Sequence, residues 1–262
     1  RRISRHKFCL SGLYRETGRI MKLPVRILVA AGFLAVAAPV QAADVMPLVD
    51  AHLHYSHDAW ENLPPKDAIA AIRRAGLKKA FVSSSSDDGT QMLYAAAPDL
   101  IVPVLRPYRK RGELGTWFRD PTVIDMLESR LKKGGYAGIG EFHIFGADAD
   151  GAVFRKVVQL AKKYKVFLHA HSDADAVDRI FKQDPDATVL WAHSGFAEPD
   201  RIAPMLKFMI GTDTYTPERW YFVEEHAGWS RTWLQSLPRG LAERIAWKNA
   251  MELANWALKI KD

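Results

Sequence analysis

Two pairs of histidines in this chain have a spacing that allows them to hold one metal ion together. His52 and His54 lie two residues apart in the segment DAHLH, and His169 and His171 repeat that spacing in FLHAH. Residues two apart in a β-strand point to the same face, so each pair can present both imidazoles to one ion. Imidazole nitrogens are common ligands of zinc. Taken alone, such a pair more often marks a polar strand end.

Three further ionisable residues follow apolar runs elsewhere in the chain. Glu141 ends the segment GIGE, His193 follows VLWA, and Asp213 ends IGTD. A buried Glu is costly unless it is paired or bound to a cation, so Glu141 is equally consistent with metal ligation and with a surface position. Of the eight histidines after residue 42, all but two belong to these groups or, like His143, lie beside one. Histidines used only for packing would show no such bias.

The elements that must position these residues alternate between strand-like and helix-like segments. The predicted helices have apolar residues at steps of three and four, with Pro near the start and Gly beyond the end; they include residues 65–75, 121–133 and 152–163. The predicted strands are short apolar runs covering residues 47–54, 77–84, 100–106, 136–141, 166–171, 187–193 and 208–213. This alternation predicts a parallel sheet covered by helices.

The ionisable strand ends decide between an open sheet and a barrel. A closed barrel brings all carboxyl ends to one mouth, whereas an open sheet spreads them along a row. We therefore predict an α/β fold of the TIM-like (β/α) barrel type. His193 and Asp213 are only 20 residues apart, with one predicted helix at 198–207, so a strand–helix unit is missing between Lys207 and Phe208. We expect either a barrel with a gap or an internally deleted copy.

The first 42 residues are expected to lie outside this domain. Residues 21–42 have a basic start, an apolar run (ILVAAGFLAVAA) and small residues before a cleavage point after Ala42, the pattern of a signal peptide. Residues 1–20 are an upstream extension without predicted structure, and residues 43–262 form the barrel domain. The apolar run is too short for a membrane span, so we expect a secreted or periplasmic protein without a membrane anchor after cleavage.

Charge and cysteine content narrow the function. Residues 1–42 hold 8 of 37 Lys and Arg and 1 of 30 Asp and Glu, which leaves 29 of each and no net charge in residues 43–262. We therefore expect no nucleic-acid partner. The only cysteine, Cys9, precedes the predicted cleavage point, so a disulfide, a cysteine nucleophile and a thiolate ligand are excluded from the mature chain.

The order of these residues resembles the amidohydrolase superfamily over nearly all of residues 43–262. That family has H-x-H after strand 1, Lys or Glu after strand 4, His after strands 5 and 6, and Asp after strand 8. The D-x-H-x-H start and the GTD segment are most similar to the amidohydrolase-2 group, and GIGE is also similar to TatD-type nucleases. The resemblance implies a metal-dependent hydrolase acting on a small-molecule substrate.

The resemblance also implies residue roles. His52, His54 and Asp213 would bind a divalent metal, with zinc expected as one or two ions. His169 would be the ligand after strand 5, with His171 a close second. Glu141 would bridge two metals or remain an acid beside one.

The same resemblance implies a catalytic mechanism. Metal binding lowers the pKa of water to about 7, and Asp213 would take its proton and pass it to the leaving group. His193 would hold a metal or stabilise the oxyanion. Arg106 is the best candidate for binding a substrate carboxylate or phosphate, and Tyr215 would line the mouth of the barrel.

We therefore expect hydrolysis of an amide, ester or lactone bond in a small molecule. The enzymatic alternative is metal-dependent, non-oxidative decarboxylation of an aromatic acid, which amidohydrolase-2 relatives also perform. A TatD-like nuclease gains no support from the absence of net charge. The missing strand–helix unit motivates a different reading, a catalytically impaired barrel that still binds metal.

Overall fold

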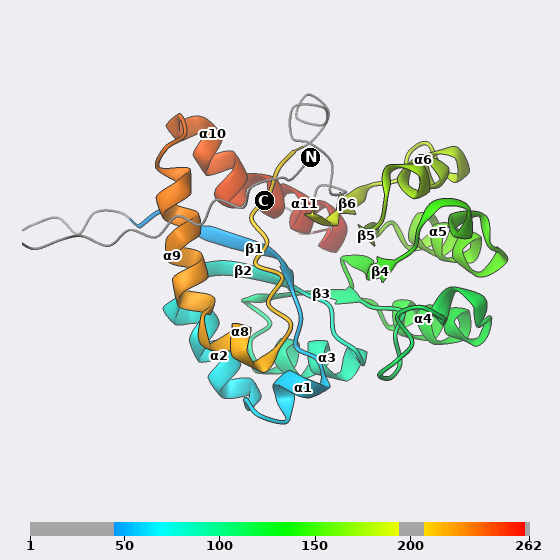
Figure 1. Ribbon diagram of the computed structural model, residues 1–262, viewed down its shortest axis with the longest axis horizontal. Helices are drawn as coiled ribbons and strands as arrows, with labels where there is room; N and C mark the ends of the chain where they lie inside the picture. The colour runs from blue at the N-terminus through cyan, green and yellow to red at the C-terminus, as the bar shows by residue number, and fades with distance from the viewer. Residues whose placement is uncertain (1–44, 194–206, 260–262) are drawn as a thin grey trace, which may run out of the picture. The chain divides into compact units, whose positions relative to one another are not determined.

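A six-stranded parallel sheet forms the centre of the protein in a computed structural model that describes residues 45–193 and 207–259 (Figure 1). Each strand pairs with the next along the chain. The strands are β1 (Leu48–Leu53), β2 (Leu77–Val82), β3 (Ile101–Leu105), β4 (Gly138–His143), β5 (Phe167–His171) and β6 (Val189–Trp191). They curl into a half-barrel, which confirms the α/β class and six of the seven predicted strands.

One long helix connects each strand to the next. These helices are α2 (Pro65–Arg74), α3 (Asp87–Ala96), α4 (Thr122–Lys133), α5 (Ala152–Tyr164) and α6 (Ala174–Gln183). Shorter helices lie at His57–Trp60 (α1), Trp117–Arg119 and Gly146–Asp150. The C-terminal part contains α8 (Pro217–Tyr221), α9 (Val223–Leu234), α10 (Arg239–Glu243), a π-helical turn (Arg244–Lys248) and α11 (Asn249–Leu258). Among the described helices, none is long and apolar enough to cross a bilayer.

Proline and glycine mark the helix boundaries as the sequence predicted. Pro65 occupies the first turn of α2, where its missing N–H costs no helical hydrogen bond. Gly76 follows that helix with a φ of 67°, and Gly134 follows α4 with a φ of 80°, both in the left-handed region that glycine adopts most easily. Three of the four helices predicted by residue range, at 65–75, 121–133 and 152–163, are therefore confirmed, with ends that agree within one residue.

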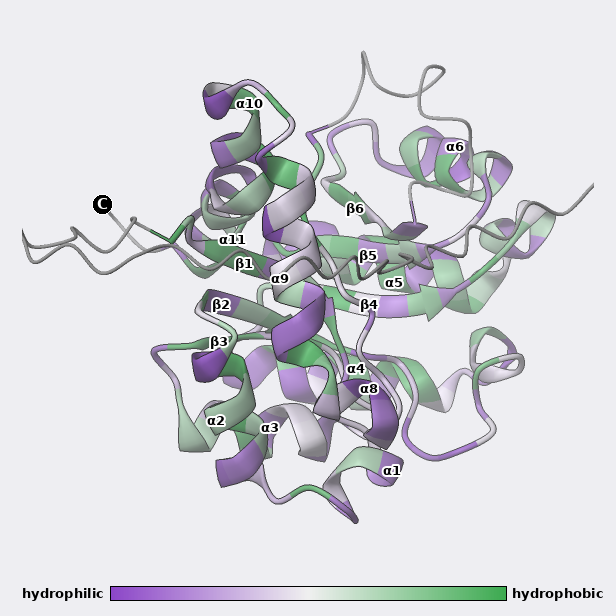
Figure 2. Cartoon of the chain, turned by 60° about the vertical axis from the view of Figure 1, so that its left-hand side comes forward, coloured by the Kyte–Doolittle hydropathy of each residue, from purple (hydrophilic) through white to green (hydrophobic). Residues whose placement is uncertain are grey.

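The interior of the half-barrel is apolar and is covered partly by α11. The rings of Phe81 and Phe167 lie 5.9 Å apart there. The small side chains of Ala250, Ala254 and Ala257 place one face of α11 in the same buried cluster. Figure 2 shows β1 mainly in the hydrophobic colour and α8 mainly in the hydrophilic one. This packing fixes the strands whose ends carry the ionisable residues.

The seventh predicted strand, residues 208–213, is not a regular strand. The segment does run beside β1: the Ala51 N–H donates to the Ile210 carbonyl, and the Asp213 N–H donates to the His52 carbonyl, each at 2.8 Å. Asp213 has a φ of 49°, which an extended strand cannot contain. The last segment therefore returns to the first strand, as in a barrel, without forming a regular ladder.

The half-barrel is not closed by the described residues. Within residues 45–193 and 207–259, no strand joins β6 to the segment 208–213, so a full barrel is not confirmed. The predicted helix at 198–207 lies outside the described residues, apart from Lys207. The proposed extension at 1–20 and the proposed signal peptide at 21–42 lie outside them as well.

A buried carboxylate ties the returning segment to β1. Asp50 accepts hydrogen bonds from the backbone N–H groups of His52 (3.0 Å) and Thr212 (3.1 Å) and from the Thr212 hydroxyl (2.6 Å). Its side chain is fully buried, and burial raises the pKa of this carboxyl group despite those donors. Asp50 thus helps to set where Asp213, the next residue after Thr212, lies against His52.

We predict that Asp50→Ala lowers the free energy of unfolding by about 3 kcal/mol, because the buried N–H of His52 and the half-buried N–H and hydroxyl of Thr212 lose their acceptor. Asp50→Asn keeps one oxygen for these groups and should cost clearly less. Urea unfolding followed by circular dichroism measures both. Equal losses for the two variants would contradict this role of the carboxylate oxygen.

Candidate metal centre

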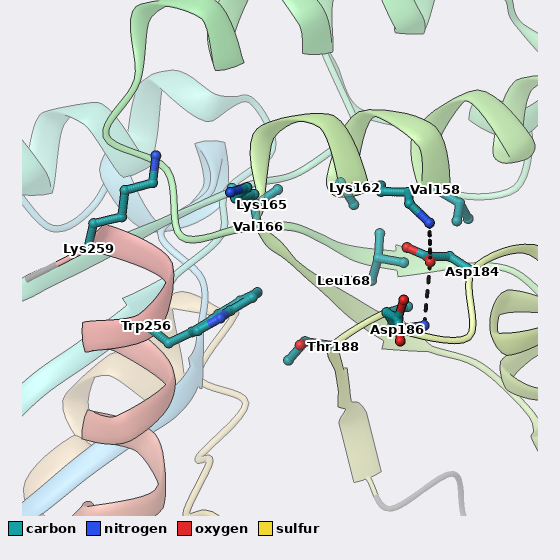
Figure 3. Close-up of a pocket in the computed structure, with 12 residues that line it drawn as sticks. Val158, Lys162, Lys165, Val166, Leu168, Asp184, Asp186, Thr188, Trp256 and Lys259 are labelled. Atoms are coloured by element: carbon teal, nitrogen blue, oxygen red, sulfur yellow. Dashed lines mark hydrogen bonds and ion pairs between the residues drawn. The ribbon is translucent and has the colours of Figure 1, made fainter.

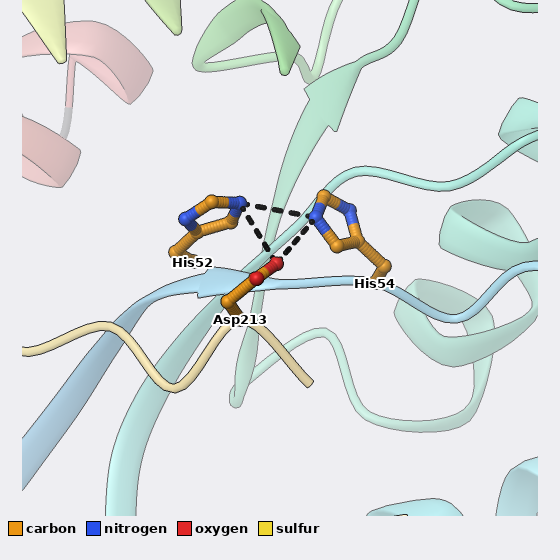
Figure 4. Close-up of side chains that lie close together, drawn as sticks. All are labelled: His52, His54 and Asp213. Atoms are coloured by element: carbon orange, nitrogen blue, oxygen red, sulfur yellow. Dashed lines mark hydrogen bonds and ion pairs between the residues drawn. The ribbon is translucent and has the colours of Figure 1, made fainter. Parts of the chain in front are cut away.

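Two histidines and an aspartate meet at the carboxyl end of β1 (Figure 4). The Nε2 atoms of His52 and His54 lie 3.0 Å apart, and Oδ1 of Asp213 lies 3.5 Å from each of them. Both imidazoles are buried. The spacing of two along the strand has therefore brought both rings to one face, and the returning segment adds a carboxylate.

Glu141 contributes a second carboxylate from β4. Its side chain is almost completely buried, with Oε1 3.3 Å from His52 Nε2 and Oε2 3.3 Å from His54 Nε2. A register shift between β4 and β5 occurs here, since Gly140 pairs with His169 while His143 pairs with His171. The extra residue in β4 is a β-bulge, which can redirect a side chain at a strand end.

The spacing of the donor atoms matches what a small divalent cation requires. Zinc–nitrogen and zinc–oxygen bonds of about 2.0–2.1 Å in a tetrahedron place neighbouring ligand atoms about 3.3 Å apart. The Nε2–Nε2, Nε2–Oδ1 and Nε2–Oε distances are 3.0, 3.5 and 3.3 Å. The buried histidines, Glu141 and Asp213 therefore fit a metal ion, although other divalent ions are compatible with this donor set.

The Nδ1 atom of His54 is already used, which leaves Nε2 to face the other donors. It lies 2.5 Å from the carbonyl oxygen of Ser83, to which an Nδ1–H group can donate. Metal-binding histidines commonly donate their second ring N–H to a backbone carbonyl, because this fixes the tautomer and the ring orientation. The Ser83 hydroxyl also accepts from the Glu141 N–H at 3.2 Å, so one serine positions two candidate ligands.

Most of the expected ionisation states suit a cation. The exception is His54: burial and Arg106 oppose its protonation, but contacts with Asp213 and Glu141 raise its pKa, so it would lose a proton when a metal binds. Burial alone would raise the pKa of Glu141, but contacts with four histidines hold it well below its ordinary value. Burial lowers the pKa of His52 and keeps its imidazole neutral. For Asp213, burial opposes ionisation, yet His54 and His52 lower its pKa below the ordinary value. Ionised carboxylates and neutral imidazoles are the forms that bind metals.

Arg106 lies behind this group and binds Glu141. Its Nε donates to the Glu141 carbonyl at 3.0 Å and its Nη2 to Oε2 at 2.9 Å. The guanidinium is buried, and Nη1 lies 3.3 Å from His54 Nδ1. The residue proposed from sequence as a substrate ligand therefore has two of its donors committed to orienting and neutralising Glu141.

His171, His143 and His193 form a further group of donors around Glu141. Nδ1 of His171 is 2.8 Å from Oε1 of Glu141, and Nε2 of His193 is 3.7 Å from the same oxygen. The rings of His171 and His143 stack at 4.0 Å. Donor atoms lie within 4.8 Å of one another in three sets: His52–His54–Asp213, His52–Glu141–His193 and Glu141–His143–His171. This arrangement could hold one ion or two.

His169 occupies a different position from His171. Its ring lies 4.6 Å from that of His52 and is almost completely buried, and neither nitrogen has a hydrogen-bond partner among the described residues. It belongs to none of the three donor sets, whereas His171 does. Gly140 explains how the strands pack so closely here, because a Cβ at Gly140 would collide with the His169 carbonyl oxygen.

The sequence placed Ser83 and Tyr108 at the rim of the mouth but did not predict that they contact candidate metal ligands. The Tyr108 hydroxyl accepts from the His143 N–H at 2.8 Å and lies 2.8 Å from His143 Nδ1, so it holds that ring in place. Burial lowers the pKa of His143 to about 3, which keeps it neutral. Ser83 directly follows β2, and Tyr108 lies just beyond β3. A polar residue at the carboxyl end of a strand is the sequence signal that could have indicated both contacts.

A cleft of about 450 Å³ opens from this cluster toward the carboxyl ends of the strands. His193, Asp213 and Tyr215 line it, together with the exposed Leu114. The Tyr215 ring is half exposed and lies 5.0 Å from the Arg219 guanidinium. Tyr215 therefore lies at the rim of the cleft, where the sequence had placed it.

Comparison with known proteins adds no family assignment. No protein-family model matches the chain. No curated protein matches it either.

We predict that replacing both His52 and His54 by Ala removes bound metal, because two of the donors are lost. Elemental analysis of the purified protein after incubation with zinc measures this. His226→Ala is the matched control, since that residue lies on α9 and belongs to none of the donor sets. Equal metal content in the double variant and the control would refute the site.

Replacing Arg106 by Leu should weaken zinc affinity about 10–100-fold. Residues that hydrogen-bond to metal ligands and hold them in place typically contribute this much. Competition with a chelator gives the affinity. Arg119→Leu serves as the comparison, because that exposed arginine pairs only loosely with Asp148, at 3.6 Å. Unchanged affinity in the Arg106 variant would show that its contacts with Glu141 are not used in metal binding.

Proposed function

We propose that this protein is a metal-dependent hydrolase that cleaves an amide, ester or lactone bond of a small molecule. The observation that carries the proposal is the group of two buried imidazoles and two ionised carboxylates beside an open cleft. Buried ionisable groups with shifted pKa values in a cleft are typical of catalytic sites. The resemblance to the amidohydrolase superfamily supports the same reaction class and remains part of the proposal.

His52, His54 and Asp213 would hold the metal, with Glu141 and either His171 or His193 completing the site. A divalent ion there supplies Lewis-acid chemistry and a water whose pKa is lowered toward neutrality. Zinc is the proposed ion because imidazole and carboxylate donors suit it. Ser83 and Arg106 orient these ligands through the contacts with His54 and Glu141.

Asp213 is the proposed general base. Its carboxylate is partly exposed to the cleft and is ionised near neutral pH, so it can accept a proton. The proton would pass from the attacking water to Asp213 and then to the departing oxygen or nitrogen. The carbonyl carbon gains the hydroxyl group while its bond to that atom breaks.

His193 is the proposed oxyanion contact. It lies between the cleft and Glu141, and hydrogen bonding with this carboxylate raises its pKa. A protonated imidazole there can donate to a carbonyl oxygen as negative charge develops on it. Both His193 and Asp213 have left-handed φ values, 52° and 49°. Non-glycine residues held in that region often occur at functional sites.

Export remains a prediction that accompanies this function. The proposed signal peptide would place the enzyme in the periplasm or outside the cell, where it would meet small-molecule substrates without a membrane anchor. The mature chain has no cysteine, so its proposed metal ligands are all histidines and acids.

The test is turnover of an ester, lactone and amide panel by the zinc-loaded protein. Asp213→Asn should lower kcat about 10²–10⁴-fold, the typical contribution of a general base, while the two histidines retain metal. Labelled oxygen from water should appear in the acid product. Bound metal without turnover would instead indicate an impaired barrel, and carbon dioxide release without labelled oxygen would indicate decarboxylation.

A further inference from the structure

A second cavity reaches the candidate metal centre from the open flank of the half-barrel. It has a volume of about 630 Å³ and lies between β6, the segment beginning at Lys207, and α11. Its size falls within the range of small-molecule sites. We call it the flank pocket. The described residues leave the half-barrel open on this side, where the sequence predicts that a strand–helix unit is missing.

The inner end of the flank pocket is the candidate metal centre itself. His52, His169, His193 and Asp213 all line it. His193 and Asp213 also line the mouth cleft, so the same residues face two cavities. A ligand bound at these residues can therefore extend in two directions, outward through the mouth cleft and sideways into the flank pocket.

The rest of the pocket wall is mainly apolar. Large apolar side chains from α6, β6, the returning segment and α11 form it: Phe181, Val189, Trp191, Phe208, Ile210 and Leu253. Beyond the inner end, the charged side chains among its described lining residues are Lys207 and Glu252, which pair with each other at 3.0 Å on the exposed edge. The pocket therefore favours an uncharged, apolar group.

His169 marks the junction between the two regions. It is 2% exposed and has two nitrogens without hydrogen-bond partners among the described residues. Both nitrogens are themselves buried, so they are not presented to a ligand in the pocket. His169 therefore closes the inner end of the pocket, beside His52 and below the apolar wall.

We propose that the flank pocket receives the aromatic or branched-alkyl part of the acyl group of the substrate. This assignment rests on the proposed hydrolase function. The carbonyl carbon would lie beside His193 and Asp213, and the leaving group would extend into the mouth cleft. The substrate class is an ester, amide or lactone of an aromatic or branched carboxylic acid, rather than of a short one such as acetate.

A third cavity, of about 460 Å³, must be kept separate from the flank pocket (Figure 3). It lies at the amino ends of β5 and β6, away from the metal centre, and its Lys162 pairs with Asp184 at 2.7 Å. Trp256 and Thr188 line both cavities, so substitutions of these residues cannot distinguish them. Leu253 and Phe181 line the flank pocket only.

The experiment measures binding of 2-naphthoate and acetate to the full chain loaded with zinc by calorimetry. 2-Naphthoate stands for an acid product with a large aromatic group, and acetate stands for an acid product without such a group. Transfer of the ring from water should make naphthoate bind at least about 10-fold more tightly than acetate. Leu253→Trp, which fills the flank pocket, should remove this advantage, whereas Leu114→Trp, the same change in the mouth cleft, should leave it.

Phe181→Ala provides a variant that is less demanding for folding, because this side chain is 40% exposed. It should weaken naphthoate binding about 3–10-fold. Phe222→Ala is its control, since Phe222 is similarly exposed, at 48%, and lies outside the pocket. Circular dichroism establishes that each variant is folded.

The proposal is overturned if naphthoate gains nothing over acetate, or if Leu114→Trp and not Leu253→Trp removes the gain. Naphthoate binding that depends on Leu253 and Phe181, without hydrolysis of any ester, lactone or amide, would leave the pocket assignment standing and reject the hydrolase. Hydrolysis without a preference for large acyl groups, together with naphthoate binding that is unchanged in the Leu253 and Phe181 variants, would support the hydrolase and reject the pocket assignment.

Discussion

The buried charge of Glu141 is the constraint on which the site depends. A carboxylate withdrawn from water must be compensated by nearby donors or cations. Here Arg106 contributes a charged pair at 2.9 Å, and the imidazole nitrogens of His171, His52 and His54 lie 2.8–3.3 Å away. Arg106 supplies one compensating charge, but Asp213 brings a second anion to the same histidines. Arg219, 3.6 Å from Asp213, partly balances this second charge. A cation between the donors would balance the remainder and would take the place of the proton that a raised pKa favours on His54.

The fold positions these groups through strand ends and the segment that returns to β1. Each strand end places one or two polar side chains at the same edge of the sheet, and helices between strands keep the order of the chain. Asp50 then links β1 to the returning segment through Thr212, which sets Asp213 against His52 and His54. The described residues leave the half-barrel open between β6 and the returning segment. The candidate site draws mainly on β1, β4, β5 and the returning segment, with His193 alone coming from beyond β6.

The sequence predicted the parts of the structure that are governed by local periodicity. Alternation of apolar strands and amphipathic helices gave six of the strands and three of the helices, and the spacing of His52 and His54 gave their common face. The left-handed backbone conformation of Asp213 has no signature in the pattern of apolar residues. The prediction that residues 208–213 form a strand is therefore wrong. The choice between His169 and His171 depends on a register shift in β4, which is a property of two strands together. The partners of Arg106 likewise come from tertiary packing.

Zinc-edge anomalous diffraction from crystals of the zinc-loaded protein would show whether these groups bind a metal together. We expect an anomalous peak within bonding distance of His52 Nε2 and His54 Nε2 and of a carboxylate oxygen from Asp213 or Glu141. A crystal that contains zinc elsewhere but shows no peak between these atoms would contradict it.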